Sequence, residues 1–371
     1  MSVQFFQDLS ISNLTLASLK KMGYKEPTEI QAKAIPLILQ RKDLIAQAQT
    51  GTGKTAAFGI PIVEIINSKQ RKIQALILVP TRELAMQVTK EIKDIGRFKR
   101  IFVLAVYGGK SIQRQIEFLQ KARDVVVVGT PGRVKDLINR GHLKLNHVRI
   151  LVLDEADRML DMGFIEDIRE IISHLPEEKQ NLLFSATMPK AVLNLAKEFL
   201  NPEFEIIKVK PEEIVIDRIK QMAYKIKTQN RFLKLVEILK EYGDIKTIIF
   251  TQTKKVADEV AYKLKNQGFK SSSIHGDFSQ IKREKVLRDF KADEFKILVA
   301  TDIAARGLDI KGVDLIINYE IPRDPDSYIH RIGRTGRAGK RGLAISIFSY
   351  AENKYFRNIK SRTQANIELI L

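Results

Sequence analysis

The sequence contains no cysteine and no tryptophan in its 371 residues. Without cysteine, the chain can form neither disulfide bonds nor thiolate metal sites. It has no run of about eighteen apolar residues, so we expect no transmembrane helix and no membrane partner. Its first residues, MSVQFFQDLS, lack the basic and apolar regions of a signal peptide. We therefore expect a protein of a reducing compartment, the cytoplasm.

Acidic residues are too few to balance the basic ones. The chain has 63 Lys and Arg against 44 Asp and Glu, a net charge of +19, and both halves share the excess. Such an excess favours a polyanionic partner, nucleic acid before membrane. A lysine-rich surface that only keeps the protein soluble is the alternative. Hydrophobic residues make up 44% of the chain, enough for a buried core.

Short apolar runs alternate with longer amphipathic segments. The runs are continuous rather than alternating, which is typical of parallel strands buried on both faces. The length favours two domains, and a proline with clustered charges lies between them. We predict an α/β fold of two domains, 1–208 and 218–371, each a parallel sheet flanked by helices, with a linker at 209–217. The expected strands are 43–47, 74–79, 100–106, 124–128, 149–153, 181–185 and 204–209, then 246–250, 270–274, 296–300, 314–318 and 343–348.

The stretch AQAQTGTGKTAAF, residues 46–58, follows an expected strand and begins a helix. It has the pattern of a P-loop, with Ala48 in place of the usual first glycine. The loop glycines let backbone N–H groups surround phosphates, Lys54 reaches the β- and γ-phosphates, and Thr55 offers a hydroxyl to Mg²⁺. The alternative is an unrelated glycine-rich turn. We predict an ATP site that also includes Gln49, Thr50, Gly51, Thr52 and Gly53.

The stretch ILVLDEADRML, residues 150–160, places carboxylates directly after an apolar strand. Ligands of open α/β sheets gather at the carboxyl ends of the strands. Asp154 is therefore the candidate Mg²⁺ holder, and Glu155 can orient or deprotonate the attacking water. The alternative is an acidic helix N-terminus, where carboxylates interact favourably with the helix dipole.

In the second half, YIHRIGRTGRAGKRG carries arginines at every third position, Arg331, Arg334 and Arg337. A solvated basic face is the plain interpretation. The interspersed glycines weaken a helix here, so we expect tight backbone to present these side chains. An arginine delivered to a γ-phosphate accelerates hydrolysis by about 10³ to 10⁵. Its place in the second domain would make hydrolysis depend on closure of the domains.

Together these motifs resemble the DEAD-box RNA helicases of helicase superfamily 2, from Phe6 to about residue 350. Residues 154–157 spell the family's name. The resemblance implies two tandem RecA-like domains, an RNA-stimulated ATPase, and ATP and Mg²⁺ as cofactors. It also implies that Gln31 reads the adenine edge and that Tyr24 stacks near it. Further residues it assigns to ATP are Phe6 and Glu26 beside Gln31, Gly307 and Asp309 near the ribose, and Arg334 and Arg337 as arginine fingers.

The same resemblance assigns residues to RNA and to the coupling of RNA with ATP. For RNA they are Pro80, Thr81, Arg82, Gly109, Thr130, Arg133, Arg283 and Thr301. For coupling they are Asp157, Ser185, Thr187, His330 and Arg331. Contacts to phosphates and 2′-hydroxyls carry no sequence information, so we expect nonspecific RNA binding.

We predict from this an ATP-dependent RNA helicase that binds single-stranded RNA across both domains. Duplex steps cost on the order of 1–2 kcal/mol each, so one closure can offset only a few of them. Local opening of short duplexes, or remodelling of RNA–protein complexes, is the expected activity. An ATP-gated RNA clamp with little turnover and a DNA helicase are the alternatives. We expect a monomeric core.

Overall fold

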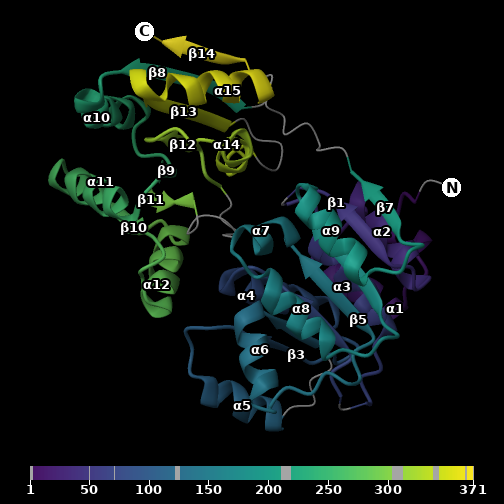
Figure 1. The fold of residues 1–371 in the computed structure, drawn as a ribbon. Helices are drawn as coiled ribbons and strands as arrows, with labels where there is room; N and C mark the ends of the chain where they lie inside the picture. Colours follow the sequence, from purple (N-terminus) through teal and green to yellow (C-terminus); the bar gives the residue numbers. More distant parts are fainter. Residues whose placement is uncertain are drawn as a thin grey trace. The chain divides into compact units, whose positions relative to one another are not determined.

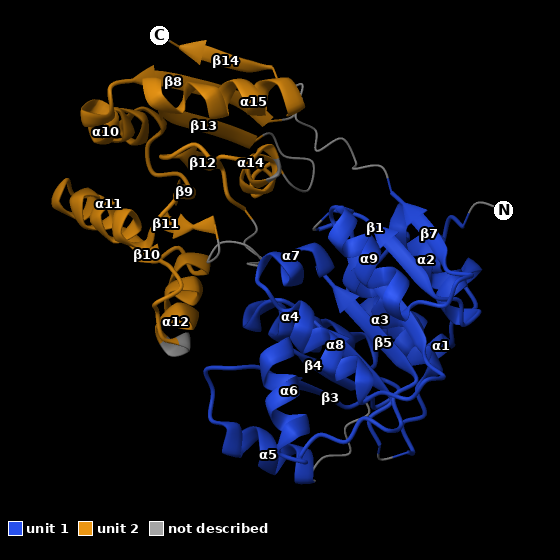
Figure 2. Ribbon diagram, viewed as in Figure 1, with its two compact units in different colours: residues 1–211 blue, residues 212–371 orange. Residues whose placement is uncertain are grey.

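The computed structural model describes residues 3–49, 51–70, 72–121, 126–209, 219–302, 312–336, 342–363 and 366–370. The chain divides into two compact units, residues 1–211 and 212–371 (Figures 1 and 2). Of the predicted linker, the structure describes only Val209, which packs in the core of the first unit. No helix in the described ranges is long and apolar enough to cross a membrane.

The first unit is built on a sheet of seven parallel strands. In order across the sheet they are β3 (Val103–Val106), β4 (Val126–Gly129), β2 (Ala75–Leu78), β5 (Ile150–Asp154), β6 (Gln180–Ser185), β1 (Leu44–Gln47) and β7 (Glu205–Lys208). Alternate residues of β2 enter two different hydrophobic clusters, Ile77 one and Leu76 and Leu78 the other. Both faces of this sheet are therefore buried, as continuous apolar strands require.

Helices cover this sheet and connect its strands. They are the short η1 (Phe6–Asp8), α1 (Asn13–Lys21), α2 (Glu29–Leu39), α3 (Lys54–Ile65), α4 (Arg82–Ile95), α5 (Ile112–Lys121), α6 (Pro131–Asn139), α7 (Ala156–Asp161), α8 (Ile165–Ser173) and α9 (Lys190–Phe199). Several of the motifs named above, including the P-loop and residues 154–157, lie where a strand ends and a helix begins. Thr81, for example, caps α4 by accepting a hydrogen bond from the Leu84 N–H at 3.3 Å.

The second unit is also built on seven parallel strands. Across the sheet they are β10 (Ser271–Ile274), β11 (Ile297–Thr301), β9 (Thr247–Thr251), β12 (Leu315–Asn318), β13 (Gly342–Ser349), β8 (Ile219–Ile226) and β14 (Ile367–Ile370). In the described ranges, its helices are η3 (Thr228–Asn230), α10 (Arg231–Tyr242), α11 (Lys254–Asn266), α12 (Gln280–Lys291), α14 (Pro325–Ile332), η4 (Tyr350–Glu352) and α15 (Asn353–Thr363). The predicted α/β fold with two parallel sheets is confirmed.

The two sheets have the same strand order. Counted within its own unit, each sheet reads third, fourth, second, fifth, sixth, first, seventh strand. Strand β8 thus corresponds to β1, β12 to β5 and β13 to β6. Two strands, β8 and β14, were missing from the sequence prediction. Strand β8 carries lysines and half-buried positions toward its end, so it lacks the continuous apolar run of its neighbours.

Candidate functional site

The parallel strands place all their carboxyl ends on one edge of the first sheet. Along that edge, the P-loop follows β1, Asp154 ends β5 and Glu155 and Asp157 follow it, and Ser185 and Thr187 lie at the end of β6, between β5 and β1. The predicted RNA residues follow β2, β4 and β3, which are the three strands on the other side of β5. The strand order therefore brings residues that are distant in the sequence to one edge of the sheet. The predicted nucleotide and coupling residues form one group there, and the predicted RNA residues form the adjacent group.

The P-loop connects β1 to α3. Gly51 and Gly53 have φ angles of 93° and 91°, a left-handed conformation that favours glycine. Lys54 is the first residue of α3, and its buried Nζ donates a hydrogen bond to the Ala48 carbonyl at 2.8 Å. Thr55 follows in the first turn. The free N–H groups at this helix start favour an anion.

Gln31, predicted to read adenine, contacts the P-loop directly. Its Oε1 accepts from the Thr28 N–H at 3.0 Å, and its Nε2 donates to the Gly53 carbonyl at 3.1 Å. The Thr28 hydroxyl donates to the Thr52 carbonyl at 2.8 Å. The start of α2 therefore holds the P-loop backbone in place. The adenine contact stays a prediction.

The other predicted adenine-side residues lie before α2. The Tyr24 hydroxyl donates to Glu91 Oε1 at 3.0 Å, and its ring meets that of Phe6 edge-on at 5.9 Å. Burial and, next, the Glu91 carboxylate raise the pKa of Tyr24 far above its usual value. Glu26 is exposed. The ring of Phe6 is buried in the core of the unit.

Asp154 ends β5 and is only 2% exposed. Burial raises the pKa of its carboxyl to about 7, against the opposing effect of the Lys54 ammonium; Glu155 adds to the increase. Carboxylate oxygens such as those of Asp154 and hydroxyls such as that of Thr55 are of the ligand type that Mg²⁺ takes. No three acidic or histidine side chains among the described residues form a metal cage.

Glu155 is held in an unusual backbone conformation. Its φ and ψ of 53° and 49° are left-handed, although it is not glycine, and it precedes the first residue of α7. Its side chain is almost fully buried and accepts a hydrogen bond from Arg158, one turn further along α7. Strain of this kind persists only where the surrounding structure enforces it, and it is concentrated at functional sites.

The predicted coupling residues of the first unit form one hydrogen-bonded cluster. Asp157 Oδ2 accepts from both the N–H and the hydroxyl of Thr187, at 2.9 and 2.8 Å. The buried Ser185 hydroxyl donates to the Thr187 carbonyl at 2.8 Å and accepts from the Asp157 N–H at 3.2 Å. The segment after β5 is thereby tied to the segment after β6.

Three of the predicted RNA residues of the first unit, Arg82, Gly109 and Arg133, lie close to one another. A Cβ added to Gly109, whose φ is 81°, would lie 1.8 Å from Arg82 Nη1, so the guanidinium packs on this glycine. Arg133 Nη1 donates to the Lys110 carbonyl at 3.3 Å. Burial lowers the pKa of Arg133, and the nearby Arg82 charge contributes. Thr130 precedes α6, and Pro80 is buried before α4.

In the second unit, Arg331 lies in α14 and is 2% exposed. Its Nε and Nη2 donate to both Asp302 oxygens at 2.6 and 2.7 Å. Its Nη1 donates to Asn318 Oδ1 at 3.1 Å and to the Glu320 carbonyl at 2.7 Å. The expectation that tight backbone presents this arginine is wrong, because a helix buries it against β11 and β12.

The remaining predicted residues of this unit divide into described and undescribed ones. Thr301 ends β11 and Arg334 follows α14, both buried, whereas His330 and Arg283 are half-buried. Thr50 in the P-loop and three residues of the second unit, Gly307, Asp309 and Arg337, lie outside the described residues.

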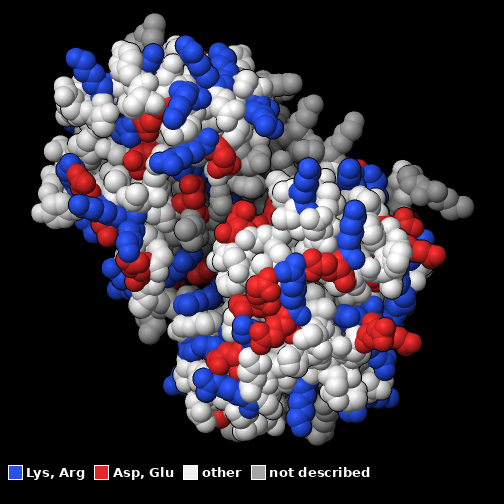
Figure 3. All heavy atoms as spheres, in the orientation of Figure 1, with Lys and Arg blue, Asp and Glu red and all other residues white. Residues whose placement is uncertain are grey.

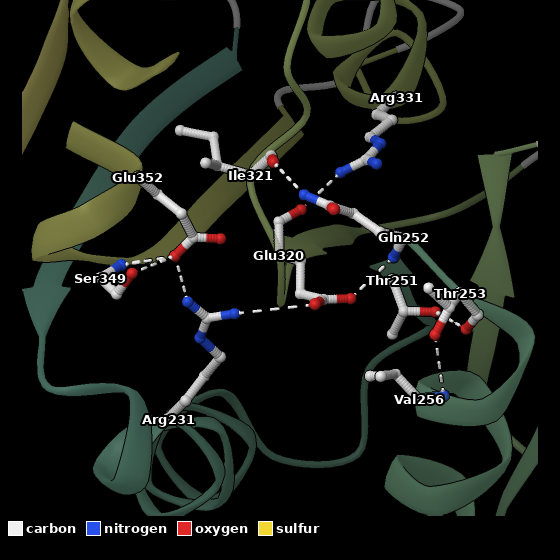
Figure 4. Close-up of polar contacts among 10 residues, drawn as sticks. All are labelled: Arg231, Thr251, Gln252, Thr253, Val256, Glu320, Ile321, Arg331, Ser349 and Glu352. Atoms are coloured by element: carbon white, nitrogen blue, oxygen red, sulfur yellow. Dashed lines mark hydrogen bonds and ion pairs between the residues drawn. The ribbon is translucent and has the colours of Figure 1, made fainter. Parts of the chain in front are cut away.

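A charged network that the sequence analysis did not identify surrounds Arg231 (Figure 4). Arg231 is hydrogen-bonded to Glu352 and lies 4.0 Å from Glu320 Oε1. Glu352 Oε2 also accepts from the Ser349 N–H and hydroxyl, each at 2.7 Å. Glu320 Oε2 accepts from the Gln252 N–H at 2.7 Å. The spacing from Ser349 to Glu352 is that of a capping box, the one signal the sequence offered.

The network around Arg231 lies in the part of the second unit that corresponds to the P-loop region of the first. Arg231 is the first residue of α10, which follows β8, as Lys54 is the first residue of α3, which follows β1. Glu320 follows β12, the counterpart of β5. In the second unit, the position that corresponds to the P-loop lysine is therefore occupied by an arginine paired with the chain's own carboxylates.

Comparisons with known proteins match this architecture. A family model described as DEAD/DEAH box helicase matches residues 28–195, and one described as helicase conserved C-terminal domain matches residues 230–339. The DEAD-box ATP-dependent RNA helicase CshA of Geobacillus kaustophilus is 52% identical over 98% of this chain and 77% of its own length. The CshA of Bacillus subtilis is 48% identical over 98% of this chain and 73% of its own length.

A solved structure is similar as well. The structure of S. cerevisiae Dbp5 bound to RNA and ADP BeF3 matches with a TM-score of 0.89 and 33% identity, covering 99% of this chain and 95% of that one. The two sheets are accordingly tandem RecA-like folds, as the sequence predicted.

Proposed function

This chain belongs to the DEAD-box family of ATP-dependent RNA helicases, and we propose that it binds single-stranded RNA with residues of both domains and locally unwinds short RNA duplexes. The domains would be 1–208 and 218–371, with 209–217 as the linker. The single observation that carries the proposal is the order of motifs along the first sheet. Residues predicted to bind phosphate, to couple and to bind RNA follow neighbouring strands of that sheet.

For ATP, the P-loop would surround the phosphates with its N–H groups, and Lys54 would leave the Ala48 carbonyl for the β- and γ-phosphates. Thr55 and Asp154 would hold Mg²⁺, which neutralises phosphate charge when bound. A cation there also favours the ionised form of Asp154, whose pKa burial otherwise raises to about 7.

Glu155 would orient the attacking water and accept its proton. Its buried carboxylate and left-handed backbone fix the direction in which the side chain points. Arg334 and Arg337 would stabilise the charge that develops on the γ-phosphate, a contribution of roughly 10³ to 10⁵ in rate. Hydrolysis would then depend on both domains, because these arginines belong to the second.

For RNA, Arg82, Gly109 and Arg133 would contact the backbone, together with Thr130 of the same edge and with Arg283 and Thr301 of the second domain. Support comes from the packing of Arg82 on Gly109 and from its proximity to Arg133, which concentrates positive charge. The bonds between Asp157 and Thr187 would transmit the state of the nucleotide to these residues. Backbone contacts predict binding without sequence preference.

The test is a steady-state ATPase measurement with Mg²⁺ at one stated salt concentration. It compares no nucleic acid, single-stranded RNA and single-stranded DNA of equal sequence. Stimulation by RNA alone, lost by at least about 100-fold in Glu155→Gln, is the expected result. The exposed Glu166→Gln in α8 is the matched control and retains full activity.

Two other outcomes would contradict the proposal. Tight ATP-dependent RNA binding with negligible turnover would show a clamp instead of a helicase. Equal stimulation by DNA would show that 2′-hydroxyl contacts do not define the substrate.

A further inference from the structure

The outer face of α15, the last helix of the second unit, is basic. Its exposed residues include Lys354, Arg357, Lys360 and Arg362, and the helix contains no acidic residue. None of these four forms an ion pair with a side chain in the described parts of the chain. Figure 3 shows blue side chains gathered over α15 in the upper part of the view.

Other exposed helices of this protein contain acidic residues that pair with some of their basic ones. In α8, Arg169 pairs with Glu166 at 2.6 Å, and in α11, Lys263 pairs with Glu259 at 2.6 Å. Like charges three or four residues apart repel and weaken an isolated helix. The unpaired charges of α15 therefore oppose its own stability, which favours a role in binding over a role in folding.

Aromatic rings extend the basic surface. Lys354 Nζ and the Arg323 guanidinium lie 5.0 and 6.0 Å from the centre of the Tyr355 ring. Tyr350, directly before α15, is 64% exposed, and Lys225 Nζ lies 4.5 Å from its ring centre. Cation–π contacts of this kind fix the positions of flexible basic side chains. We define the α15 patch as the four basic residues of α15 with Lys225 and Tyr350.

The patch lies on a rigid support. Phe356 and Ile359, on the inner face of α15, are buried in the core of the second unit, and Phe356 stacks on Phe348 at 4.4 Å. Helix α15 also packs against α14, which contains His330 and Arg331. The basic surface and the predicted coupling residues thus belong to neighbouring helices of one unit.

We propose that the α15 patch binds the phosphate backbone of an RNA strand beyond the segment that the predicted RNA residues hold. Unpaired lysines and arginines on one helix face suit a row of phosphates. The exposed ring of Tyr350 suits stacking by an unpaired base. The inference rests on the proposed function, which supplies RNA as the ligand. It adds a second contact surface that none of the helicase motifs includes.

The experiment measures equilibrium binding of fluorescent single-stranded RNA to the full chain, with a nonhydrolysable ATP analogue. Two lengths are compared, about 8 and about 30 nucleotides, because one binding module covers roughly 4–16 nucleotides. Arg357→Glu/Lys360→Glu reverses two charges of the patch. Lys240→Glu/Lys265→Glu is the matched control, since both lysines are exposed, unpaired with described residues, and placed on α10 and α11 of the same unit.

The patch variant is expected to bind the long strand about tenfold more weakly than the wild type and the short strand equally well. Its affinity should also depend less steeply on salt, with a slope reduced by about 0.7 for each phosphate that the patch no longer neutralises. The control variant should behave as the wild type with both lengths.

Equal affinity of patch variant and wild type for the long strand would overturn this inference and leave the patch to a different partner. An equal loss of affinity for the long strand in the patch and control variants would also overturn this inference, because the net charge alone would then explain the loss. Failure of the wild type to bind even the short strand would contradict the proposed function instead.

Discussion

The carboxylate of Asp157 accepts two hydrogen bonds from one residue, the backbone N–H and the hydroxyl of Thr187. Asp157 comes one residue after the start of α7, and Thr187 follows β6. If this pair couples nucleotide to RNA, Thr187→Val should leave ATP hydrolysis nearly intact and reduce duplex unwinding several-fold. Valine has nearly the shape of threonine but lacks the hydroxyl, whose lost bond costs about 1 kcal/mol.

Unwinding and hydrolysis by Thr187→Val are measured on the same preparation with a short RNA duplex. Thr187→Ser keeps the hydroxyl and serves as the control. It should unwind as much duplex for each ATP hydrolysed as the wild type. A fall of both activities by the same factor would show that Thr187 supports hydrolysis itself and not its coupling to RNA.

Gly109→Ala is expected to weaken RNA binding by about tenfold without affecting ATP binding. The added methyl group would meet Arg82 Nη1 at 1.8 Å and displace the guanidinium. The left-handed backbone alone costs alanine roughly 1–2 kcal/mol. Gly141→Ala distinguishes backbone strain from the clash with Arg82. Gly141 also has a left-handed backbone, with a φ of 72°, but no atom lies within 4 Å of the added methyl group. RNA affinities that fall equally in both variants would contradict the role of Arg82.

Arg231→Met is expected to loosen the second unit only. Removing one partner of a buried ion pair costs about 3–5 kcal/mol, because it leaves the other charge unpaired. In hydrogen–deuterium exchange of the full chain, amides of α10, β12 and β13 should lose protection, and those of β1 and β5 should not. Arg231→Met/Glu352→Gln, which removes both charges, should recover part of the loss. No recovery would mean that Arg231 stabilises the unit by packing.

Glu64 is expected to make the first unit sensitive to acid. Burial alone would raise its pKa, but hydrogen bonds from Lys99, Thr15 and Ser12 outweigh burial, and the pKa of Glu64 lies below its ordinary 4.5. A carboxyl with a lowered pKa in the folded state stabilises the fold above about pH 4.5. That stabilisation disappears as the pH falls through the folded-state pKa.

Glu64→Gln should therefore lower the free energy of unfolding by about 1.5–3 kcal/mol at pH 7. The difference from the wild type should shrink as the pH falls below about 4. Urea unfolding at several pH values measures this difference in the free energy of unfolding. The control is Glu178→Gln at an exposed position, which should stay close to the wild type. A constant difference at all pH values would mean that the glutamate charge is irrelevant.

Much of this fold follows from local sequence. Of the fourteen strands in the described ranges, the sequence predicted twelve, and most of these from continuous apolar runs, because a strand buried on both faces tends to be apolar throughout. The P-loop was predictable down to its glycines, since a left-handed backbone at Gly51 and Gly53 restricts the residue type. Asp154 and Glu155 were placed correctly at a strand end by the same reasoning.

What local sequence could not predict is where long side chains point. Arg331 and Arg334 look equivalent in a repeat of three, yet Asp302, directly after β11, and Asn318, the last residue of β12, bind Arg331 inside the unit. Gln31 likewise bonds with Gly53, which lies 22 residues away. Such contacts depend on which strands are neighbours in the sheet, and a periodic pattern contains no information about strand order.

The shared strand order of the two sheets bears on how many nucleotides one chain can bind. Of the two corresponding positions, the first unit has Lys54 at the end of a glycine loop, and the second has Arg231, which is paired with Glu320 and Glu352. If the P-loop binds ATP as proposed, the second position would add no further nucleotide, although the architecture is duplicated. The work available in each cycle would then be that of a single phosphoanhydride bond, which would limit how much duplex one molecule opens before it exchanges its nucleotide.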